Sequence, residues 1–216
     1  RKNMFIPSTS LENNGEIDIK SFAASETKQN LLRAFAGESQ ARNRYTFAAQ
    51  RAKTEGYALF ERIFTYTADQ EKAHAAIFFQ HLQQGAPGEN ISINAAYPVD
   101  DGSSMISLLQ AAHHNEFEEF ESAYPAFADT AEREGFPKIA AQFRMIAEIE
   151  QSHGERFHLF ASYMEKDQLF KSPTETKWVC LNCGNIVYAK EAPLLCPVCS
   201  HNQGYFIREE LAPFTK

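Results

Sequence analysis

Residues 64–78 read FTYTADQEKAHAAIF, and residues 143–157 read FRMIAEIEQSHGERF. Both segments begin and end with phenylalanine and carry the motif Glu-x-x-His at their centre. A shift of 79 residues superimposes the two motifs, placing Glu71 on Glu150 and His74 on His153. Side chains three positions apart lie on the same face of an α-helix. Each segment therefore predicts a helix that presents a carboxylate beside an imidazole.

The surroundings of each motif separate core-facing pairs from exposed ones. A single Glu-x-x-His is a weak indication of a ligand pair, because such pairs are common on solvated helices. At helical spacing, Glu71 and Glu150 are flanked by apolar side chains, which include Phe64, Ala68 and Phe78 for the first and Phe143, Ile146 and Phe157 for the second. A third copy, Glu155-x-x-His158, has mostly polar neighbours on its helix face. We expect the first two pairs to face the core and the third to face water.

The same repeat organises most of the chain. At the offset of 79, Tyr45 matches Tyr124, and Glu55-Gly56 matches Glu134-Gly135. Helical periodicity predicts helices over residues 26–56, 57–84, 103–134 and 137–166, the third with a kink at Pro125. Tight turns at the two glycines make two antiparallel hairpins, and the middle connection of about 17 residues can run the length of a bundle. The sequence therefore predicts an all-α ferritin-like four-helix bundle with one long crossover.

The other two predicted helices add carboxylates to this core. Glu38 falls on the apolar face of the first helix, Glu116 falls on that of the third, and Glu119 follows one turn later. Each alone could be a solvated residue, as we expect of Glu118 and Glu121. Together they give a core with five carboxylates and two imidazoles, for which Arg42 is the nearest cation in sequence.

Metal ions resolve this excess of negative charge. A buried carboxylate without a partner costs several kcal/mol, and one arginine cannot balance five of them. Two metal ions can, and the mixed oxygen and nitrogen donors suit iron or manganese. A Glu from each of two helices and Glu-x-x-His from each of the other two is the ligand pattern of di-iron carboxylate bundles. Five carboxylates exceed the charge of two ferrous ions but not that of two ferric ions, so the fifth carboxylate favours the ferric pair.

A second metal motif lies in the C-terminal 37 residues, which hold all four cysteines as Cys180-x-x-Cys183 and Cys196-Pro197-x-Cys199. Two such loops bring four thiolates around one tetrahedral ion. Structural zinc ribbons share this spacing, whereas Gly184, Pro197 and Trp178 are similar to a rubredoxin, in which the ion is iron. We predict an extended N-terminal arm over residues 1–25, the bundle over 26–167, a linker over 168–177 and the four-cysteine domain over 178–216.

Composition narrows the class of protein. The 216 residues carry a net charge of −7 with no basic block, which argues against nucleic-acid and anionic-membrane binding. No apolar run approaches the roughly 18 residues that span a bilayer, so we expect no membrane protein. Cysteines confined to one short domain indicate a metal site in a reducing compartment, and the cytoplasm is the expected location. No glycine-rich nucleotide-binding loop is present, so we expect no bound nicotinamide.

Two metal motifs in this order resemble the rubrerythrin family, and the resemblance covers residues 26–211. It implies that a di-iron centre is held by Glu38, Glu71, His74, Glu116, Glu119, Glu150 and His153. It also implies that Cys180, Cys183, Cys196 and Cys199 hold one iron, with zinc as the alternative occupant, and that Tyr45 and Tyr124 hydrogen-bond to ligand carboxylates. One iron is expected to be bound by His74 when ferrous and to shift toward Glu119 when ferric. Asn115 departs from the family, which has glycine before the first glutamate of the third helix.

By the same resemblance, we expect a non-haem peroxidase that reduces hydrogen peroxide to water in defence against oxidative stress. Electrons would come from an external donor, a rubredoxin or an NADH-dependent reductase, and would pass singly through the four-cysteine iron. A homodimer or higher homo-oligomer would bring the tail of one chain near the di-iron site of its partner. Two alternatives stay open: a ferroxidase or iron-handling bundle that uses oxygen, and a non-enzymatic zinc-ribbon interaction protein.

Overall fold

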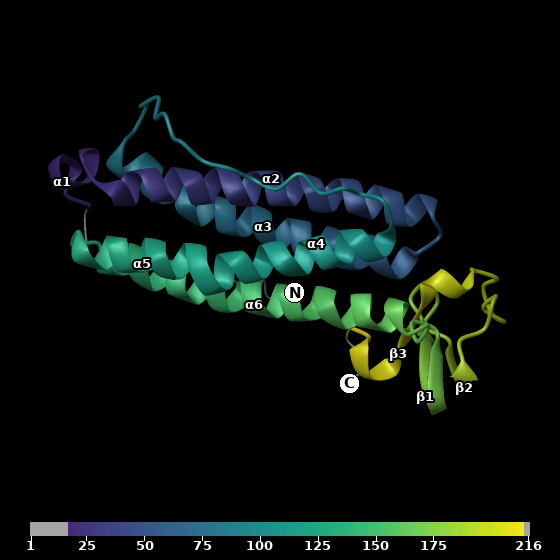
Figure 1. The fold of residues 1–216 in the computed structure, drawn as a ribbon. Helices are drawn as coiled ribbons and strands as arrows, with labels where there is room; N and C mark the ends of the chain where they lie inside the picture. Colours follow the sequence, from purple (N-terminus) through teal and green to yellow (C-terminus); the bar gives the residue numbers. More distant parts are fainter. Residues whose placement is uncertain (1–16, 214–216) are drawn as a thin grey trace, which may run out of the picture.

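The computed structural model describes residues 17–213 and consists of a long helical bundle with a small sheet at one end (Figure 1). The helical part comprises α1 (Ile19–Ala23), α2 (Glu26–Thr54), α3 (Ala58–Gly85), α4 (Met105–Glu118), the π-helical turn η1 (Glu119–Ala123), α5 (Tyr124–Arg133) and α6 (Pro137–Glu165). The C-terminal part comprises β1 (Lys171–Cys180), β2 (Ile186–Glu191), η2 (Gln203–Tyr205), β3 (Phe206–Arg208) and η3 (Glu209–Leu211). None of the helices within residues 17–213 combines the length and the apolar composition that a membrane span requires.

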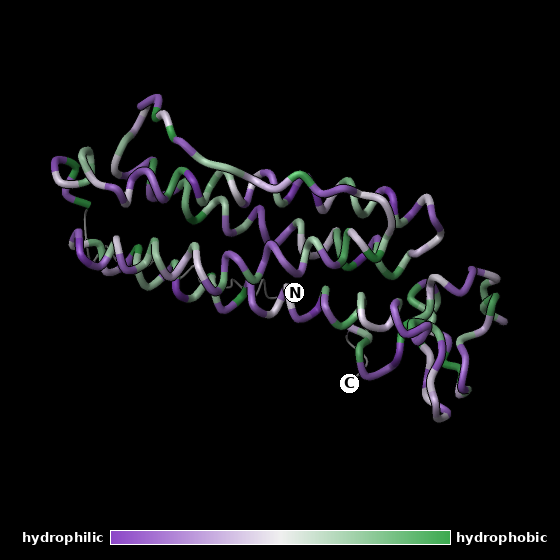
Figure 2. Tube along the Cα trace, in the orientation of Figure 1, coloured by the Kyte–Doolittle hydropathy of each residue, from purple (hydrophilic) through white to green (hydrophobic). Residues whose placement is uncertain are grey.

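Two antiparallel hairpins form the bundle, one from α2 and α3 and one from α4, α5 and α6 (Figure 1). Their turns are built alike: Gly56 and Gly135 adopt φ values of 83° and 86°, in the left-handed region that favours glycine. After each glycine a backbone N–H returns to the preceding helix, at 2.8 Å in both hairpins. Hydrophobic and hydrophilic residues alternate along each helix, as burial of one face requires (Figure 2). The repeat in the sequence is thus a repeat of hairpins, and the predicted ferritin-like bundle is confirmed.

The crossover, residues 86–104, runs along the outside of α2 (Figure 1). Three arginines of α2 hold it at successive points. The Nε of Arg33 donates to the carbonyl of Asn94 at 3.2 Å, Arg44 pairs with Asp100 at 3.0 Å, and Arg51 donates to the carbonyl of Ser103 at 3.2 Å. These three contacts fasten the second part of the connection, from Asn94 to Ser103, along α2, after a first part that arches away from the helices (Figure 1).

Two matching aromatic groups pack in the bundle core. Tyr45, Phe64 and Phe157 form one group, with ring centroids 5.2–5.9 Å apart. Their repeat equivalents Tyr124, Phe143 and Phe78 form the other, with centroids 4.9–5.8 Å apart. These groups belong to two separate apolar clusters. The repeat thus gives the bundle a core with equivalent apolar halves.

The last residues of the predicted N-terminal arm are helical rather than extended. Residues 19–23 form the short helix α1, capped by the Asp18 side chain, which accepts from the N–H of Lys20 at 3.2 Å. Phe22 of this helix is fully buried, since its ring lies against Gly85 and packs edge-on to Phe136 at 5.6 Å. Residues 1–16 of the predicted arm lie outside the described part of the chain.

The third predicted helix is interrupted just before Pro125 rather than simply kinked at it. The turn η1 precedes α5, and the N–H of Tyr124 donates to the carbonyl of Glu119 five positions back. Proline has no N–H and its ring clashes with the carbonyl four residues earlier. A wider π-type turn accommodates that change while the helix continues.

The C-terminal domain is a three-stranded antiparallel sheet in the order β2-β1-β3. The predicted linker is not a free connection, because residues 171 and 176–177 already pair with β2. Val179 and Ile207 of the sheet are buried in the same apolar cluster as the adjoining end of the bundle. Gly204 lies so close to the α2–α3 turn that a Cβ there would fall 1.9 Å from the carbonyl oxygen of Gly56. The sheet is thus packed on the bundle.

Candidate metal centres

Four helices place carboxylates and imidazoles at the centre of the bundle. Six of the seven side chains expected to hold a metal pair converge there, and all six are buried: Glu38 from α2, Glu71 and His74 from α3, Glu116 from α4, and Glu150 and His153 from α6. They form two groups of four, each with its candidate ligand atoms within 4.8 Å of one another, and Glu71 and Glu150 belong to both.

The two shared carboxylates each face both imidazoles. Oε1 of Glu150 lies 2.8 Å from Nδ1 of His74, and its Oε2 lies 2.8 Å from Nδ1 of His153. The corresponding distances from the two oxygens of Glu71 are 3.5 Å and 3.1 Å. Glu38 lies on the His74 side at 3.5 Å, and Glu116 lies on the His153 side at 3.8 Å. Two carboxylates, Glu71 and Glu150, are thus shared by both groups and are related by the repeat offset of 79, whereas the two terminal carboxylates, Glu38 and Glu116, each belong to one group and are related by an offset of 78.

The unpartnered atoms of these side chains show that the site fits metal ions. The buried Nδ1 atoms of both histidines have no hydrogen-bond partner among the described residues, and neither have both oxygens of Glu71 and Glu150 and one oxygen of Glu38 and Glu116. Although some of these atoms are close, none has hydrogen-bonding geometry toward another. Buried polar atoms are rarely left unsatisfied, and a shared metal pair would satisfy all of them with the donors that iron prefers.

The pKa shifts of these side chains also indicate that the cluster requires positive charge. Burial and the neighbouring carboxylates raise the pKa of Glu38 and Glu116 well above the ordinary value. Burial alone would lower the pKa of His153, but the facing carboxylates outweigh it and raise that pKa to about 12. Burial is likewise outweighed at Glu71, where the two facing imidazoles lower the pKa to about 2. Protons and cations therefore compete for the same cluster.

The two predicted tyrosines hold the terminal carboxylates. The hydroxyl of Tyr45 donates to Oε1 of Glu116, and the hydroxyl of Tyr124 donates to Oε1 of Glu38. Each tyrosine therefore fixes the glutamate of the opposite hairpin, leaving the other carboxylate oxygen directed at the cluster. Burial and the nearby carboxylates raise the pKa of both phenols well above the ordinary value, so both stay protonated donors.

Glu119 is the one predicted ligand that neither group of four includes. It is the first residue of the π-helical turn and is half-buried. It lines a cavity of about 460 Å³ beneath the crossover, together with Tyr97, Asn115 and Tyr124. Burial and the charge of Glu116 raise its pKa well above the ordinary value. The structure thus places Glu119 beside the cluster, at the wall of a cavity.

The residues expected to be solvated are exposed. Glu155 and His158 lie on the outer face of α6, and Glu118 and Glu121 are exposed. Arg42 is exposed as well. Arg44 of the same helix is half-buried and is paired with Asp100 of the crossover, and Asn115 donates to the same carboxylate at 3.4 Å. Sequence spacing could not reveal this contact, because residue 100 belongs to a segment without periodicity.

A further residue absent from the sequence predictions contacts His153. The side-chain oxygen of Gln70 lies 3.1 Å from Nε2 of His153, on the side of the ring remote from the carboxylates. The only signal in the sequence is that Gln70 directly precedes Glu71, where the second hairpin has Ile149 before Glu150.

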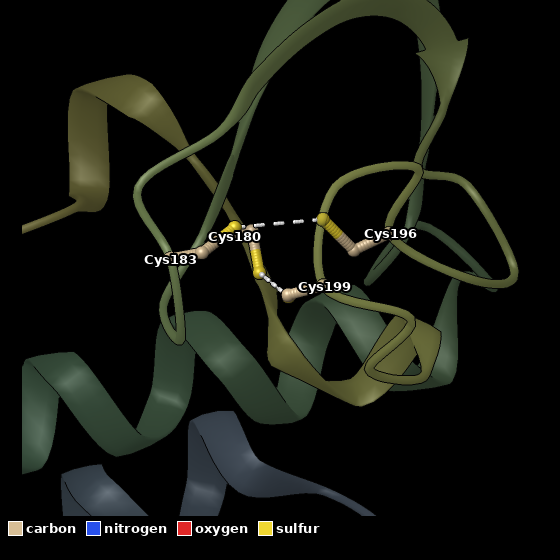
Figure 3. A group of neighbouring side chains, drawn as sticks. All are labelled: Cys180, Cys183, Cys196 and Cys199. Carbon is tan, nitrogen blue, oxygen red and sulfur yellow. Dashed lines mark hydrogen bonds between the residues drawn. The ribbon is translucent and has the colours of Figure 1, made fainter.

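The four cysteines converge as two loops that face each other (Figure 3). The Sγ atoms of Cys180 and Cys199 are 3.7 Å apart, and those of Cys183 and Cys196 are 3.6 Å apart. A tetrahedral ion with metal–sulfur bonds of about 2.3 Å separates its sulfurs by about 3.8 Å, so the four thiols fit one ion. A backbone N–H of His201 lowers the pKa of Cys199 to about 6, which favours the thiolate that binds metal.

Each cysteine loop is closed by the same backbone contacts. The N–H of Gly184 donates to the carbonyl of Cys180, and the N–H of Ser200 donates to that of Cys196, both at 2.8 Å. Both closing residues have positive φ, 77° for Gly184 and 60° for Ser200. The loops are therefore held in shape by the chain itself.

Comparison with known proteins gives matches to both parts of the chain. A family model described as Rubrerythrin matches residues 29–161, and one described as Rubrerythrin, rubredoxin-like domain matches residues 178–207. The chain is 45% identical over 188 residues to a rubrerythrin of Clostridium perfringens, covering 87% of this chain and 96% of that protein. It is 46% identical over 187 residues to a rubrerythrin of Porphyromonas gingivalis, covering 87% and 92%. A solved structure of nigerythrin in its fully reduced, all-ferrous state matches with a TM-score of 0.58 at 25% identity, covering 96% of this chain and 94% of that one.

Proposed function

Because the chain belongs to the rubrerythrin family, and so to the di-iron oxidoreductases with a rubredoxin-like domain, we propose that it is a non-haem peroxidase that reduces hydrogen peroxide to water. The observation that carries the proposal is the pair of Glu/His groups that share Glu71 and Glu150, in one chain with a four-cysteine group. A site for two adjacent metals and a site for a single metal match a reaction that takes two electrons and is resupplied one electron at a time.

The side chains of the cluster would hold the iron pair in two different ways. Glu71 and Glu150 would be shared between the two metal positions, while Glu38 with His74 and Glu116 with His153 would each serve one position. When bound, the iron pair would supply two electrons that, together with two protons, reduce one peroxide to two waters. Tyr45 and Tyr124 keep the terminal carboxylates in place, since each donates its hydroxyl hydrogen to one of them. The buried cluster needs no activated serine or cysteine nucleophile.

The cavity beside Glu119 is the proposed route by which peroxide reaches the cluster. It lies between α2, the π-helical turn and the crossover, and both Glu119 and Tyr124 line it. The aromatic groups around Phe64 and Phe143 pack the core in both apolar halves of the bundle. A small polar oxidant would therefore approach from the cavity.

The four-cysteine site is the proposed entry point for electrons. The donor would be external, a rubredoxin or an NADH-dependent reductase, and the protein would act in the cytoplasm. A homodimer or larger homo-oligomer would bring the four-cysteine iron of one chain near the di-iron site of its partner. The external donor and the oligomer are proposed from the family, the donor also from the absence of a glycine-rich nucleotide-binding loop in the sequence, and the cytoplasmic location from the confinement of the cysteines to one short domain.

One stopped-flow experiment tests the proposal against its alternatives. The iron-loaded, fully reduced protein is mixed without donor either with hydrogen peroxide or with dioxygen at equal concentration. We expect oxidation of the iron pair to be faster with peroxide, with one peroxide consumed per pair. A ferroxidase would instead react faster with dioxygen and accumulate iron. A zinc-ribbon interaction protein would lack the strong visible absorption of a ferric thiolate site.

A further inference from the structure

A series of side-chain contacts beneath the crossover joins three segments of the chain. Arg44 of α2 donates from Nε to Oε1 of Gln40 at 2.6 Å, and its Nη1 pairs with Oδ2 of Asp100 of the crossover at 3.0 Å. The other oxygen of Asp100 accepts from Nδ2 of Asn115 of α4 at 3.4 Å. The side chains of Arg44 and Asp100 are only 15% and 14% exposed. Asp100 is therefore held from both hairpins of the bundle.

This contact lies where two cavities meet. Asn115 lines the cavity of about 460 Å³ beside Glu119, here called the inner cavity, and Asp100 lines a second one of about 550 Å³, the outer cavity. The outer cavity is also lined by the exposed side chains of Phe47 and Val99. Four residues line both cavities: Gln40, Arg44, Tyr97 and Pro98. The hydrogen bond from Asn115 to Asp100 thus joins a wall of the inner cavity to a wall of the outer one.

The volume of the inner cavity does not by itself select an oxidant. Cavities of about 300–1,000 Å³ accommodate drug-sized ligands, so there is room for oxidants larger than hydrogen peroxide. The crossover, however, is fastened over this cavity, since the hydroxyl of Tyr97 donates to the carbonyl of Arg33 at 2.7 Å and Asp100 is held by Arg44 and Asn115. Selection by size would therefore take place at the contact between the two cavities.

We propose that Asn115 is a specificity-determining residue. By holding Asp100 of the crossover, it keeps the passage between the two cavities narrow, so that hydrogen peroxide reaches the cluster and bulkier alkyl hydroperoxides do not. The inference rests on the proposed function, which it deepens by naming the class of oxidant that the site rejects. A hydrogen bond to a charged group is stronger than one between neutral groups, so a single amide can hold the crossover at this point.

Two peroxides of different size measure the passage. The iron-loaded, reduced protein is mixed without donor with hydrogen peroxide or with tert-butyl hydroperoxide, which takes up the same two electrons and two protons and yields tert-butanol and water. The readout is the ratio of the two oxidation rates, because the ratio cancels effects of a substitution on the iron pair itself. We expect hydrogen peroxide to react faster with the wild type. Asn115→Ala should raise the relative rate of tert-butyl hydroperoxide about tenfold or more.

Further variants separate the hydrogen bond from the bulk of the side chain. Asn115→Leu has a side chain of similar size that cannot donate to Asp100, so the ratio should shift as it does in Asn115→Ala. Asp100→Ala removes the acceptor and should shift the ratio at least as far, and adding Asn115→Ala to it should cause no further shift, because both open the same passage. His114→Ala is the control, since His114 is the exposed neighbour of Asn115 and lines neither cavity.

Limited digestion of the same proteins with subtilisin examines the contact without any turnover. Cleavage of a segment follows the population of its detached form when opening and closing are fast. Cuts within residues 94–103, located by mass spectrometry, should appear about 5–30-fold faster in Asn115→Ala and Asp100→Ala than in His114→Ala. The digestion thus reports whether the crossover is held, and the peroxide ratio reports whether holding it selects the oxidant.

The outcomes distinguish failure of the inference from failure of the function. If the wild type reacts with hydrogen peroxide and Asn115→Ala keeps the wild-type ratio, Asn115 does not determine specificity. If only Asn115→Leu keeps that ratio, bulk rather than the hydrogen bond sets the passage and the inference is wrong. Unchanged digestion of Asn115→Ala would show that the contact does not hold the crossover. If the wild type itself does not react with hydrogen peroxide, the proposed function fails, and this inference with it.

Discussion

Glu150 and Glu155 start the same motif five residues apart on one helix, yet one is fully buried and the other is exposed. Five residues at about 100° each turn the helix by about 140° beyond a full rotation, which moves a side chain from the inner face to the outer one. The apolar neighbours of each motif predict the difference, because burial of a helix face depends on its whole stripe. The Glu-x-x-His motif alone does not predict this difference in burial.

Glu150→Ala and Glu155→Ala measure that difference as matched variants. Glu150→Ala removes the carboxylate nearest to both imidazoles, so we expect loss of bound iron and of peroxide reduction. Glu155→Ala should change the free energy of unfolding by no more than about 0.5 kcal/mol and keep its iron. Metal analysis and chemical denaturation check both. Equal loss of iron in the two variants would contradict the assignment of the inner face.

Glu119 offers a prediction about redox chemistry. It lies beside the cluster without belonging to either group of four, and it has no equivalent in the first hairpin. An added anion stabilises a ferric pair more than a ferrous pair. We therefore expect Glu119→Ala to bind two ferrous ions, to have a raised reduction potential and to be oxidised more slowly by peroxide.

A spectroelectrochemical titration of the di-iron site measures the potential of Glu119→Ala directly. Glu121→Ala is the matched control, since Glu121 lies in the same π-helical turn but is exposed and does not line the cavity. A potential that is unchanged or lower in Glu119→Ala would mean that Glu119 is a structural or solvated residue.

Six of the predicted ligand residues could be located from the sequence because each lies on the apolar face of a helix. Such a face can be recognised from the spacing of residues close together in the chain. The contacts made by Gln70 and by Arg44 with Asp100 could not, since they join residues far apart along the chain. Glu119 was predicted on helical spacing, but the π-helical turn that carries it changes that spacing locally. The side chains around the cluster are therefore harder to predict than the cluster itself.

At the scale of elements, the four helices end within about two residues of the predicted ends, because glycines and prolines mark those ends. No comparable sequence signal predicts the contacts between elements. The carboxylate of Glu134, in the α5–α6 turn, accepts from the backbone N–H groups of Glu26 and Thr27 at 2.9 Å and 2.8 Å. The second hairpin thus caps the first helix of the other hairpin. Its repeat equivalent Glu55 instead pairs with Arg51 of its own helix.

Glu134→Gln and Glu55→Gln form a matched pair that tests this cap. Glutamine offers one oxygen and places an N–H group against one of the two backbone donors, so we expect Glu134→Gln to lower the free energy of unfolding by about 1–2 kcal/mol. Glu55→Gln should stay within about 0.5 kcal/mol of the wild type. Equal effects in urea denaturation would show that the cap contributes nothing.

The pH dependence of the cap has a defined sign. Partial burial opposes the shift, but hydrogen bonds from the Thr27 hydroxyl and the two backbone N–H groups lower the pKa of Glu134 below its ordinary value near 4.5. A carboxyl with a lowered folded-state pKa stabilises above its unfolded pKa and loses that contribution as the pH falls. The difference between wild type and Glu134→Gln should be complete near pH 6 and shrink below about pH 4.5. A difference that grows in acid would contradict this assignment.

The whole molecule is less modular than its composition indicates. The change from helical periodicity to cysteine, glycine and proline marks the C-terminal domain in the sequence, and the family match to residues 178–207 agrees with it. Composition cannot show that Val179 and Ile207 share an apolar cluster with Phe60 and Leu169. Both β1 and β3 therefore contribute to the core of the bundle, and β1 also carries Cys180 of the metal site.

Deleting residues 172–216 separates electron delivery from folding. We expect the shortened protein to remain helical, to bind the iron pair and to react once with peroxide, but to turn over poorly with an external donor. It should also lose about 3 kcal/mol of stability, since Val179 and Ile207 no longer cover the bundle end. Circular dichroism, denaturation and steady-state turnover measure these effects. Normal turnover by the shortened protein would refute the role in electron delivery.

The variant Gly204→Ala tests whether the four-cysteine site depends on the packing of the sheet against the bundle. The added methyl would fall 1.9 Å from the carbonyl oxygen of Gly56, which is backbone and cannot turn aside, so the sheet and the α2–α3 turn must move apart. Overpacking of this kind costs about 1–3 kcal/mol, whereas the cysteine loops keep their own backbone closures at Gly184 and Ser200. We expect a lower free energy of unfolding with an unchanged visible spectrum of the ferric four-cysteine site. Unchanged stability would mean that the domain is not held against the bundle in solution, and a lost spectrum would mean that the cysteine loops depend on that contact for their shape.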